Sequence, residues 1–350
     1  MKDKIFIGKR EISQYAPAFI IGELSANHNQ DFDLAIKTVD AMFDAGVDCL
    51  KLQTAKPDSI TLDCDNDYFK IKGGTIWDGK TFFELYTKVY TPWEWHKPLK
   101  EYAESKGMLF FSSPFSHEAV DFLEELDVPA YKIASFEITD IPLIKYAASK
   151  GKPIIISTGI AEEDDIQCAV EACLEVGNDN VILLKCTSSY PTPLEEVNLN
   201  AINTIKEKFN CIVGLSDHTI GTLVPIGAVA FGARVIEKHF ILDRKLGGPD
   251  AEFSSNPNEF KDMIKQIRNL EKSFGTKEIV ISDKVKESKK FARSLFIVED
   301  VKNGDVLNSS NIRSIRPGHG LHPKNYEDVL GKKFIKNVSR GTPLSYDLIE

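Results

Sequence analysis

The sequence has no apolar run long enough to cross a bilayer, no regular cysteine framework and no excess of positive charge. A membrane-spanning helix needs about 20 apolar residues, and the segment 1–5 lacks the apolar core of a signal peptide. The six cysteines form no CxxC pair, which favours buried thiols in a reducing compartment. Lysine and arginine number 43 against 52 acidic residues, a formal charge of −9 that argues against nucleic-acid binding. We therefore expect a cytoplasmic protein that binds neither nucleic acid nor a membrane.

What the sequence does contain is a short apolar run that recurs eight times, each time followed by an amphipathic stretch. The near-continuous hydrophobicity of these runs is typical of strands buried on both faces. The expected strands are Phe19–Leu24, Cys49–Gln53, Met108–Ser112, Ala130–Ala134, Pro153–Thr158, Val181–Cys186, Cys211–Leu215 and Val235–Phe240. Eight strand–helix units over about 270 residues predict an α/β fold of the (β/α)₈, or TIM barrel, type. A doubly wound open sheet is the alternative.

The stretches between the strands predict helices. They are Phe32–Ala45, Pro92–Lys106, His117–Leu126, Ile141–Ser149, Glu162–Val176, Leu194–Phe209, Thr222–Phe231 and Asn258–Phe274. The connection 56–91 is long for a strand–helix loop, and active sites of TIM barrels are built from such loops. We expect it either to cover a sugar-like substrate or to form an interface arm.

The character of the chain changes near residue 275. We expect a catalytic barrel over 1–275, a polar, lysine-rich linker over 276–291 and a small domain over 292–350. Short β-like pieces with turns between them are expected in this last part at Ser294–Val298, Ile312–Ile315 and Phe334–Val338. A core of about sixty residues is marginal alone, so we expect this domain to dock on a larger partner.

The last two expected barrel strands each lead to a histidine, His218 and His239. Consecutive strands of a parallel barrel are neighbours, so the two imidazoles should lie close together, with Asp217, Glu237 and Asp250 nearby. Two imidazoles with oxygen ligands suit a divalent metal such as Mn²⁺, Zn²⁺ or Fe²⁺. Two unrelated histidines that satisfy backbone groups are the alternative.

Other strand ends carry lysines and hydroxyl groups. Lys51 and Lys132, together with later serines, would form a cradle for a phosphate and a carboxylate; these serines are Ser157, Ser189 and Ser216. The alternative is a structural ion-pair network such as Lys51 with Glu23. A buried lysine also raises imine chemistry of the class I aldolase type, through Lys132 or Lys238, although paired histidines would serve no purpose in it.

In sequence order, a set of short motifs resembles the sialic acid synthase family. The motifs lie at 23–29 (ELSANHN), 51–54 (KLQT), 110–115 (FFSSPF), 131–137 (YKIASFE), 156–159 (ISTG), 185–191 (KCTSSYP), 214–219 (GLSDHT), 237–240 (EKHF) and 247–250 (GGPD). The segment Arg313–Gly318 resembles the antifreeze-like (SAF, β-clip) domain of these enzymes. A carbohydrate- or ice-binding protein without enzymatic activity would match that last domain alone.

Two loops, 74–81 and 90–95, resemble the branch of the family that forms pseudaminic acid. The resemblance implies a metal-dependent transferase that condenses phosphoenolpyruvate with open-chain 2,4-diacetamido-2,4,6-trideoxy-L-altrose and releases phosphate by C–O cleavage. The alternative within the family is an N-acetylneuraminate or legionaminate synthase that uses an N-acetylmannosamine-type sugar.

The resemblance also implies roles for individual residues. Phosphoenolpyruvate would be held by Lys51, Ser113, Lys132, Ser135, Ser157, Ser189 and Ser216. Catalytic groups would be Glu23, Lys51, Glu137 and Asp250, and sugar contacts would come from Gln53, Tyr190, Asp250 and Arg316. His218 and His239 would bind the metal, Mn²⁺ in first place with Mg²⁺ or Co²⁺ as alternatives. Arg316 would reach the barrel of another subunit, which implies a domain-exchanged homodimer.

Overall fold

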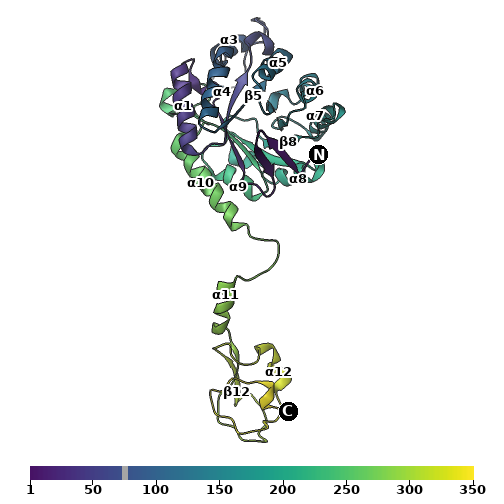
Figure 1. Cartoon of the computed structure of the whole chain (residues 1–350), viewed down its shortest axis with the longest axis vertical. Coiled ribbons are helices and arrows are strands. Elements are labelled where there is room, and N and C mark those ends of the chain that lie inside the picture. Colours follow the sequence, from purple (N-terminus) through teal and green to yellow (C-terminus); the bar gives the residue numbers. More distant parts are fainter. Residues whose placement is uncertain (73–77) are drawn as a thin grey trace. The chain divides into compact units, whose positions relative to one another are not determined.

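The computed structural model describes residues 1–72 and 78–350, and these form two compact units, Met1–Phe274 and Gly275–Glu350. Each unit has its own hydrophobic core. Figure 1 shows the strands of the first unit surrounded by its helices. All six cysteines are free thiols. No helix of the described residues is both long enough and apolar enough to cross a bilayer.

Within the described residues, eight parallel strands close into a barrel in which each strand pairs with the next one in sequence. They are β3 (Phe19–Glu23), β4 (Cys49–Thr54), β5 (Leu109–Pro114), β6 (Tyr131–Ile133), β7 (Ile154–Ser157), β8 (Val181–Cys186), β9 (Ile212–Asp217) and β10 (Val235–His239). The barrel closes where β10 pairs with β3, with Val235 opposite Phe19. The (β/α)₈ prediction is confirmed, and the open doubly wound sheet is excluded.

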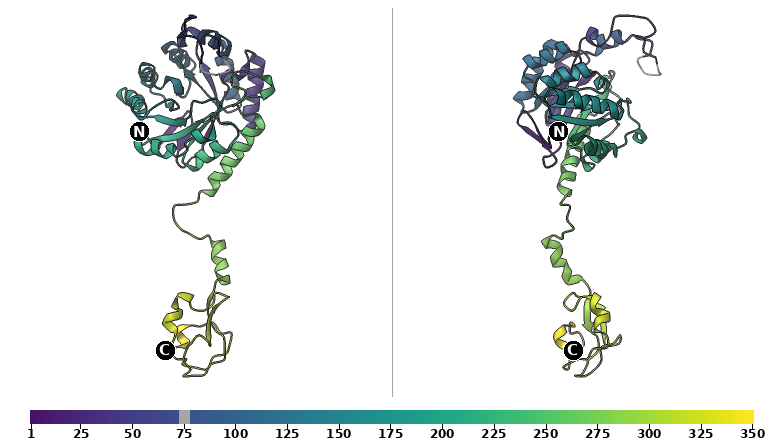
Figure 2. Two further views of the ribbon diagram at one scale, coloured as in Figure 1. Left: turned by 180° about the vertical axis from the view of Figure 1, so that it is seen from behind. Right: turned by 90° about the vertical axis from the view of Figure 1, so that its right-hand side faces the viewer.

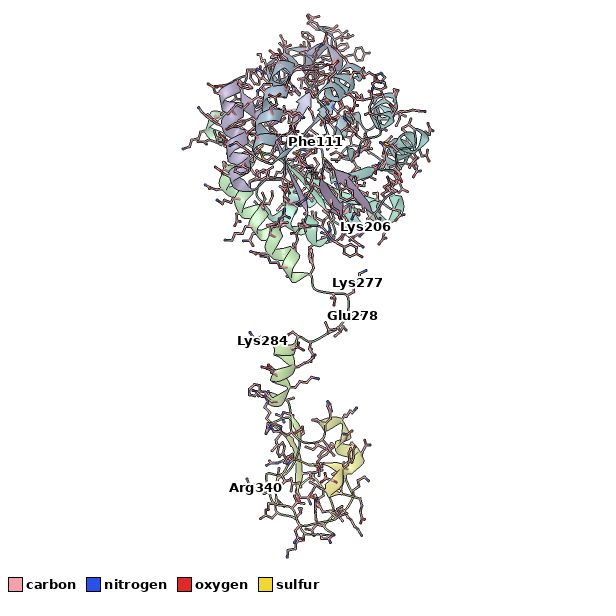
Figure 3. All side chains as sticks on the ribbon, viewed as in Figure 1. Phe111, Lys206, Lys277, Glu278, Lys284 and Arg340 are labelled. Carbon is pink, nitrogen blue, oxygen red and sulfur yellow. The ribbon has the colours of Figure 1, made fainter. Side chains whose placement is uncertain are left out.

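Helices cover the outside of the barrel in all views (Figures 1 and 2). They are α1 (Phe32–Ala45), α4 (His96–Ser105), α5 (His117–Glu125), α6 (Ile141–Ser149), α7 (Glu163–Glu175), α8 (Ala201–Phe209), α9 (Leu223–Ala230) and α10 (Pro257–Ser273). Several begin at a side chain that caps the first turn, as where Asn256 accepts from the amide of Glu259. The barrel interior is packed with apolar side chains such as Phe111, which is fully buried (Figure 3).

Two predicted helices begin later than the sequence pattern suggested. In the predicted helix Leu194–Phe209, only Leu194–Glu196 forms a 3₁₀ turn before α8 begins at Ala201. Asn198 between them has a φ of 49°, a left-handed conformation that interrupts a right-handed helix. The predicted helix Pro92–Lys106 likewise begins with a 3₁₀ turn, Trp93–Trp95, ahead of α4.

An N-terminal hairpin, β1 (Lys4–Ile7) with β2 (Arg10–Ser13), was not predicted. Its apolar side chains Ile5, Ile7 and Ile12 are buried in the core of the first unit. Gly8, which turns the hairpin with a φ of 57°, lies close to Leu109 and Pro129 at the start of barrel strands. The hairpin therefore packs against the amino ends of the strands, opposite to the ends where the polar motifs lie.

The long connection between β4 and α4 contains two short helices, α2 (Pro57–Ile60) and α3 (Phe82–Val89). A bridge between Lys70 and Thr81 joins its two sides, and Thr81 with Glu84 forms a capping box at the start of α3. Part of the loop motif 74–81 lies outside the described residues.

The second unit contains a two-stranded sheet, β11 (Ser294–Ile297) with β12 (Ile312–Ile315), and the helices α11 (Asp283–Glu287) and α12 (Tyr326–Val329). The predicted strand Phe334–Val338 is wrong, because Phe334 bridges to Ile349 and Val338 to Val301, so no continuous ladder forms. The segment 276–291, expected as a linker, includes α11. Its charged side chains Lys277, Glu278 and Lys284 are exposed (Figure 3).

Candidate active site

The candidate site lies at the carboxyl ends of the barrel strands, inside the ring, where alternate residues of each strand point toward the centre. Two lysines meet two glutamates there. The Nζ atom of Lys51 contacts Oε2 of Glu23 and lies 3.4 Å from Oε1 of Glu237. Nζ of Lys132 lies 3.6 Å from the same Glu237 oxygen. All four side chains are buried, so the sequence prediction that Lys51 and Lys132 converge agrees with the structure.

The pKa values of the buried lysines and of the nearby Glu137 are shifted in different directions. Burial disfavours the ammonium group of Lys51, but Glu23 and Glu237 outweigh it and raise the pKa of this lysine. Burial lowers the pKa of Lys132, and Glu237 opposes that effect. Burial likewise raises the pKa of Glu137 to about 7 although Lys132 lowers it, and one Glu137 oxygen is buried without a hydrogen bond from the described residues. Glu137 is thus able to exchange a proton near neutral pH.

Hydroxyl groups surround the lysines. Ser113 Oγ accepts a hydrogen bond from Lys51 at 3.3 Å, and Ser216 Oγ donates to Glu237 at 3.4 Å. The buried Ser157 Oγ has no hydrogen-bond partner in the described part of the chain. An unpaired buried hydroxyl is costly unless a ligand meets it, so Ser157 suits a binding site.

The two serines after β8, Ser188 and Ser189, have different partners, and the sequence prediction selected only Ser189. Ser188 Oγ lies 2.7 Å from Ser135 Oγ, whereas Ser189 Oγ donates to the carbonyl of Pro191 at 3.4 Å. Cys186, the last residue of β8, lies within 4.0 Å of Ser188 Oγ. Because side chains alternate along extended chain, the position two after Cys186 continues its face. That alternation could have identified Ser188.

The two histidines are neighbours, as expected. The ring centroids of His218 and His239 are 5.4 Å apart, and both side chains follow the carboxyl ends of β9 and β10. The buried ring of Phe253 stands edge-on to both, at 5.9 Å from His218 and 4.9 Å from His239. Tyr190 packs on His218 with a centroid distance of 4.4 Å. Phe253 was another residue that the sequence reasoning did not select.

The donor atoms of the pair suit a metal ion. Nδ1 of His218 lies 3.2 Å from the carbonyl of Thr187, which can only accept, so this nitrogen carries the proton and Nε2 keeps its lone pair. Burial, together with His239, lowers the pKa of His218 to about 3 and keeps it neutral. Nδ1 of His239 is buried without a hydrogen bond from the described residues and lies 3.5 Å from Asp250 Oδ2. The residues therefore fit a divalent cation.

The described residues do not offer a complete ligand set. Among residues 1–72 and 78–350, no three His, Cys, Asp or Glu side chains are grouped so that they could hold an ion. Asp217, expected near the imidazoles, instead contacts Nζ of Lys238 at 2.5 Å and Thr219 Oγ1 at 2.9 Å. It lies on the other face of its strand from Ser216. Water or substrate oxygens would have to complete the coordination of an ion on the two imidazoles.

The contact with Asp217 also corrects one expectation about Lys238. This lysine is fully buried between Asp217 and the carbonyl of Thr219, which Nζ reaches at 2.6 Å. It alternates with Glu237 and His239, so its side chain lies on the outward face of β10. Lys238 is a structural ion-pair partner, and it is not available to form an imine with a substrate.

The remaining expected site residues are placed as follows. Gln53 donates to Glu23 Oε1 at 3.0 Å and to Ser25 Oγ at 3.1 Å, which places it at the edge of the lysine cluster. Asp250 lies beside His239 and accepts from the amide of Ala26 at 3.4 Å. Arg316 belongs to the second unit, where it is exposed just after β12.

The chain is similar to known proteins over nearly its whole length. The chain is 47% identical to the pseudaminic acid synthase of Campylobacter jejuni over 93% of its length and 95% of that protein. It is also 47% identical to the pseudaminic acid synthase of Helicobacter pylori, over 95% of its length and 98% of that protein. A crystal structure of the N-acetylneuraminic acid synthetase from Leptospira borgpetersenii matches with a TM-score of 0.74 at 32% identity, covering 82% of this chain and 95% of that one.

The family profiles cover both units of the chain. The SAF domain profile matches residues 292–350, so the expected antifreeze-like domain is confirmed. The NeuB family profile matches residues 38–279, which span most of the barrel and contain Lys51, Lys132, Glu237 and the two histidines. The resemblance to sialic acid synthases is confirmed, and the chain belongs to the NeuB family.

Proposed function

We propose that this chain is a pseudaminic acid synthase, a transferase that condenses phosphoenolpyruvate with open-chain 2,4-diacetamido-2,4,6-trideoxy-L-altrose in the cytoplasm. The observation that carries the proposal is the convergence of Lys51 and Lys132 beside the His218–His239 pair at one end of a closed barrel. Such a site can hold an anionic substrate next to a carbonyl group. The likeness to synthases of the same printed name over nearly the whole chain supports the choice of substrates.

The lysine cluster would bind phosphoenolpyruvate. Its phosphate and carboxylate need cations and hydroxyl donors, which Lys51, Lys132 and the surrounding serines supply. The serines assigned to this role are Ser113, Ser135, Ser157, Ser188 and Ser216. The unpaired hydroxyl of Ser157 supports the assignment, since a phosphate oxygen would satisfy it. Ser188 takes the place first given to Ser189, whose hydroxyl is directed to the backbone of Pro191.

The two imidazoles would hold the divalent ion, Mn²⁺ in this proposal, with Mg²⁺ and Co²⁺ as alternatives. When bound, such an ion supplies Lewis acidity that polarises the aldehyde of the sugar. The tautomer of His218, fixed by Thr187, leaves Nε2 ready for a ligand bond. Asp250, beside His239, would orient that imidazole and contact a sugar hydroxyl.

The proposed reaction of the two substrates proceeds in three steps. Carbon 3 of the enol phosphate attacks the aldehyde carbon, water adds to carbon 2, and the tetrahedral product loses phosphate by C–O cleavage. Glu23, which contacts Lys51 and Gln53, would accept a proton from that water. Glu137, with a pKa of about 7, can give or take a proton at the same centre. Gln53 and Tyr190 would contact the sugar.

Phosphate release tests this proposal directly. We expect the protein to release phosphate from phosphoenolpyruvate with the altrose derivative and Mn²⁺, and to stop when a chelator is added. N-acetylmannosamine should give at most a few per cent of that rate. A faster reaction with N-acetylmannosamine would instead indicate an N-acetylneuraminate or legionaminate synthase. Absence of phosphate release with either sugar would refute it.

A second copy of the chain would complete the site. Apolar side chains are exposed beyond the carboxyl ends of four barrel strands, namely Phe136, Ile160, Leu194 and Ile220 in the connections and Leu223 at the start of α9. Exposed apolar groups around a binding site are typical of a surface that another protein covers. We assign that role to the SAF domain of a partner subunit in a domain-exchanged homodimer, with Arg316 reaching the acyl groups of the sugar.

Complementation tests the shared site. Each of two inactive variants, Arg316→Ala and His218→Ala, should regain activity when they are mixed as heterodimers, because one of the two sites would then be intact. Verified heterodimers without activity would contradict the exchange. A monomeric mass in solution would contradict the dimer.

A further inference from the structure

Glu237 takes a central position that no part of the proposed reaction explains. Its Oε1 atom lies 3.4 Å from Nζ of Lys51, 3.6 Å from Nζ of Lys132 and 3.4 Å from Oγ of Ser216. Its other oxygen, Oε2, is buried and has no hydrogen-bond partner within the described parts of the chain. One carboxylate thus stands between the two lysines that we assign to phosphoenolpyruvate.

The contacts of Glu237 are long for ion pairs in a buried place. Charge-assisted hydrogen bonds between ammonium and carboxylate groups are typically about 2.8 Å long, and the pair of Lys238 with Asp217 reaches 2.5 Å on the opposite face of the same strands. One oxygen of this buried carboxylate is thus held only at these longer distances, and the other has no hydrogen-bond partner among the described residues. Glu237 therefore contacts both ammonium groups without binding either one tightly. Each lysine also has a shorter contact, Lys51 with Glu23 and Lys132 with the carbonyl of Ile133 at 2.9 Å.

We propose that Glu237 is a placeholder anion, which in the ligand-free protein occupies the position that an oxyanion of the substrate takes between Lys51 and Lys132. On binding, each lysine exchanges the carboxylate of Glu237 for an oxygen of the phosphate or carboxylate of phosphoenolpyruvate. The inference rests on the proposed function in one respect, the assignment of these lysines to that substrate. Glu237 is a positioning residue in this scheme: its negative charge offsets the repulsion between the two ammonium groups until the ligand arrives.

Calorimetric titration with inorganic phosphate and with phosphoenolpyruvate tests the proposal without any turnover. The full-length protein is used with saturating Mn²⁺ and, in a second series, with chelator. Because Glu237→Gln removes a negative charge next to the bound oxyanion, both ligands should bind about tenfold more tightly than to the native protein. Glu237→Asp keeps the charge and should stay closer to the native affinity. Glu207→Gln, which removes the same charge from the exposed surface, should change it less than twofold.

The outcomes separate the two hypotheses. If the native protein binds neither phosphoenolpyruvate nor phosphate, the proposed function fails. If the native protein binds them and Glu237→Gln binds no more tightly, or more weakly, the placeholder is wrong and Glu237 is a structural counter-ion. A gain that appears only with Mn²⁺ would also contradict it, since it would act through the metal.

The native protein offers a test that needs no variant. In crystals soaked with phosphate, we expect an anion within hydrogen-bond distance of Lys51 and Lys132, with the carboxylate of Glu237 turned away from both. Phosphate bound to these lysines while Oε1 of Glu237 still lies within 3.6 Å of both would overturn the proposal. The same would follow if phosphate bound elsewhere and left the cluster unchanged.

Discussion

Strands β9 and β10 carry buried charged side chains on both faces, the outer face and the face inside the barrel. The two faces differ in how closely these charges are paired. On the outward face, Lys238 is held tightly by Asp217 and by the carbonyl of Thr219. On the inward face, Glu237 meets two lysines at longer distances and keeps one oxygen unpaired. Both sets are buried, so burial alone does not distinguish a structural charge from a functional one. The distinction lies in whether all partners are already present.

The largest effect should come from the inward histidines. His218→Ala should reduce phosphate release on the order of 10⁴-fold, because it removes one of the two imidazoles that would hold the proposed divalent ion. Isothermal titration with Mn²⁺ should show loss of binding, while thermal unfolding changes little. His117→Ala, which removes an exposed histidine, is the matched control. Full activity in His218→Ala would refute the role of this residue as a ligand.

The outward pair should matter for stability instead. Lys238→Met leaves the carboxylate of Asp217 buried and unpaired, so we expect a loss of about 4 kcal/mol in the free energy of unfolding, measured by urea denaturation. The double variant Asp217→Asn with Lys238→Met should recover most of that loss, because no uncompensated charge remains. Phosphoenolpyruvate affinity of the folded fraction should stay within twofold of native. A stable Lys238→Met protein that no longer binds phosphoenolpyruvate would reverse our assignment of the two faces.

A third prediction concerns Glu137, whose buried carboxylate should reduce the stability of the protein when it is ionised. The pKa of Glu137 is raised to about 7, chiefly by burial, from an ordinary value of 4.5. A raised carboxyl pKa stabilises the fold at low pH, and this contribution is lost as the pH rises through about 7. At pH 8 the loss is at most about 3 kcal/mol.

Glu137→Gln should therefore stabilise the protein at pH 8 and have little effect at pH 4, as measured by urea denaturation at both values. The pH profile of phosphate release should lose its inflection near 7 in the same variant. Glu207→Gln should show neither effect. Equal stability changes at both pH values would contradict the shift.

The smallest effect separates two adjacent serines. Ser188→Ala removes a hydroxyl that faces Ser135, and we expect a KM for phosphoenolpyruvate about fivefold higher, equivalent to about 1 kcal/mol for one hydrogen bond. Ser189→Ala should leave KM unchanged, because among the described residues that hydroxyl donates to a backbone carbonyl of its own loop. The opposite ranking would restore the assignment first made from the sequence.

The sequence was sufficient for the barrel and for the two histidines. Buried parallel strands are marked by continuous apolar runs, and each run was placed within one or two residues of the strand observed. His218 and His239 could be paired because consecutive strands of a barrel are adjacent. These predictions depend on local pattern and on strand order alone.

Other features depend on three-dimensional detail that the pattern does not carry. Strand alternation alone favours Ser188, but the partners of Ser188 and Ser189 depend on the path of the chain beyond β8. The partner of Asp217, Lys238, lies on the neighbouring strand. The hairpin β1–β2 was missed because its strands are four residues long and gain their stability from packing on the barrel. Phe253 looked like any core aromatic until its neighbours were known.

That hairpin has a consequence for traffic through the enzyme. Ile5, Ile7 and Ile12 are packed against the amino ends of the strands. The barrel is therefore closed at that end and open only at the carboxyl ends of its strands. Substrates would have to enter, and phosphate to leave, through the same opening at the carboxyl ends of the strands. Any element that covered this opening would therefore control substrate binding and product release together.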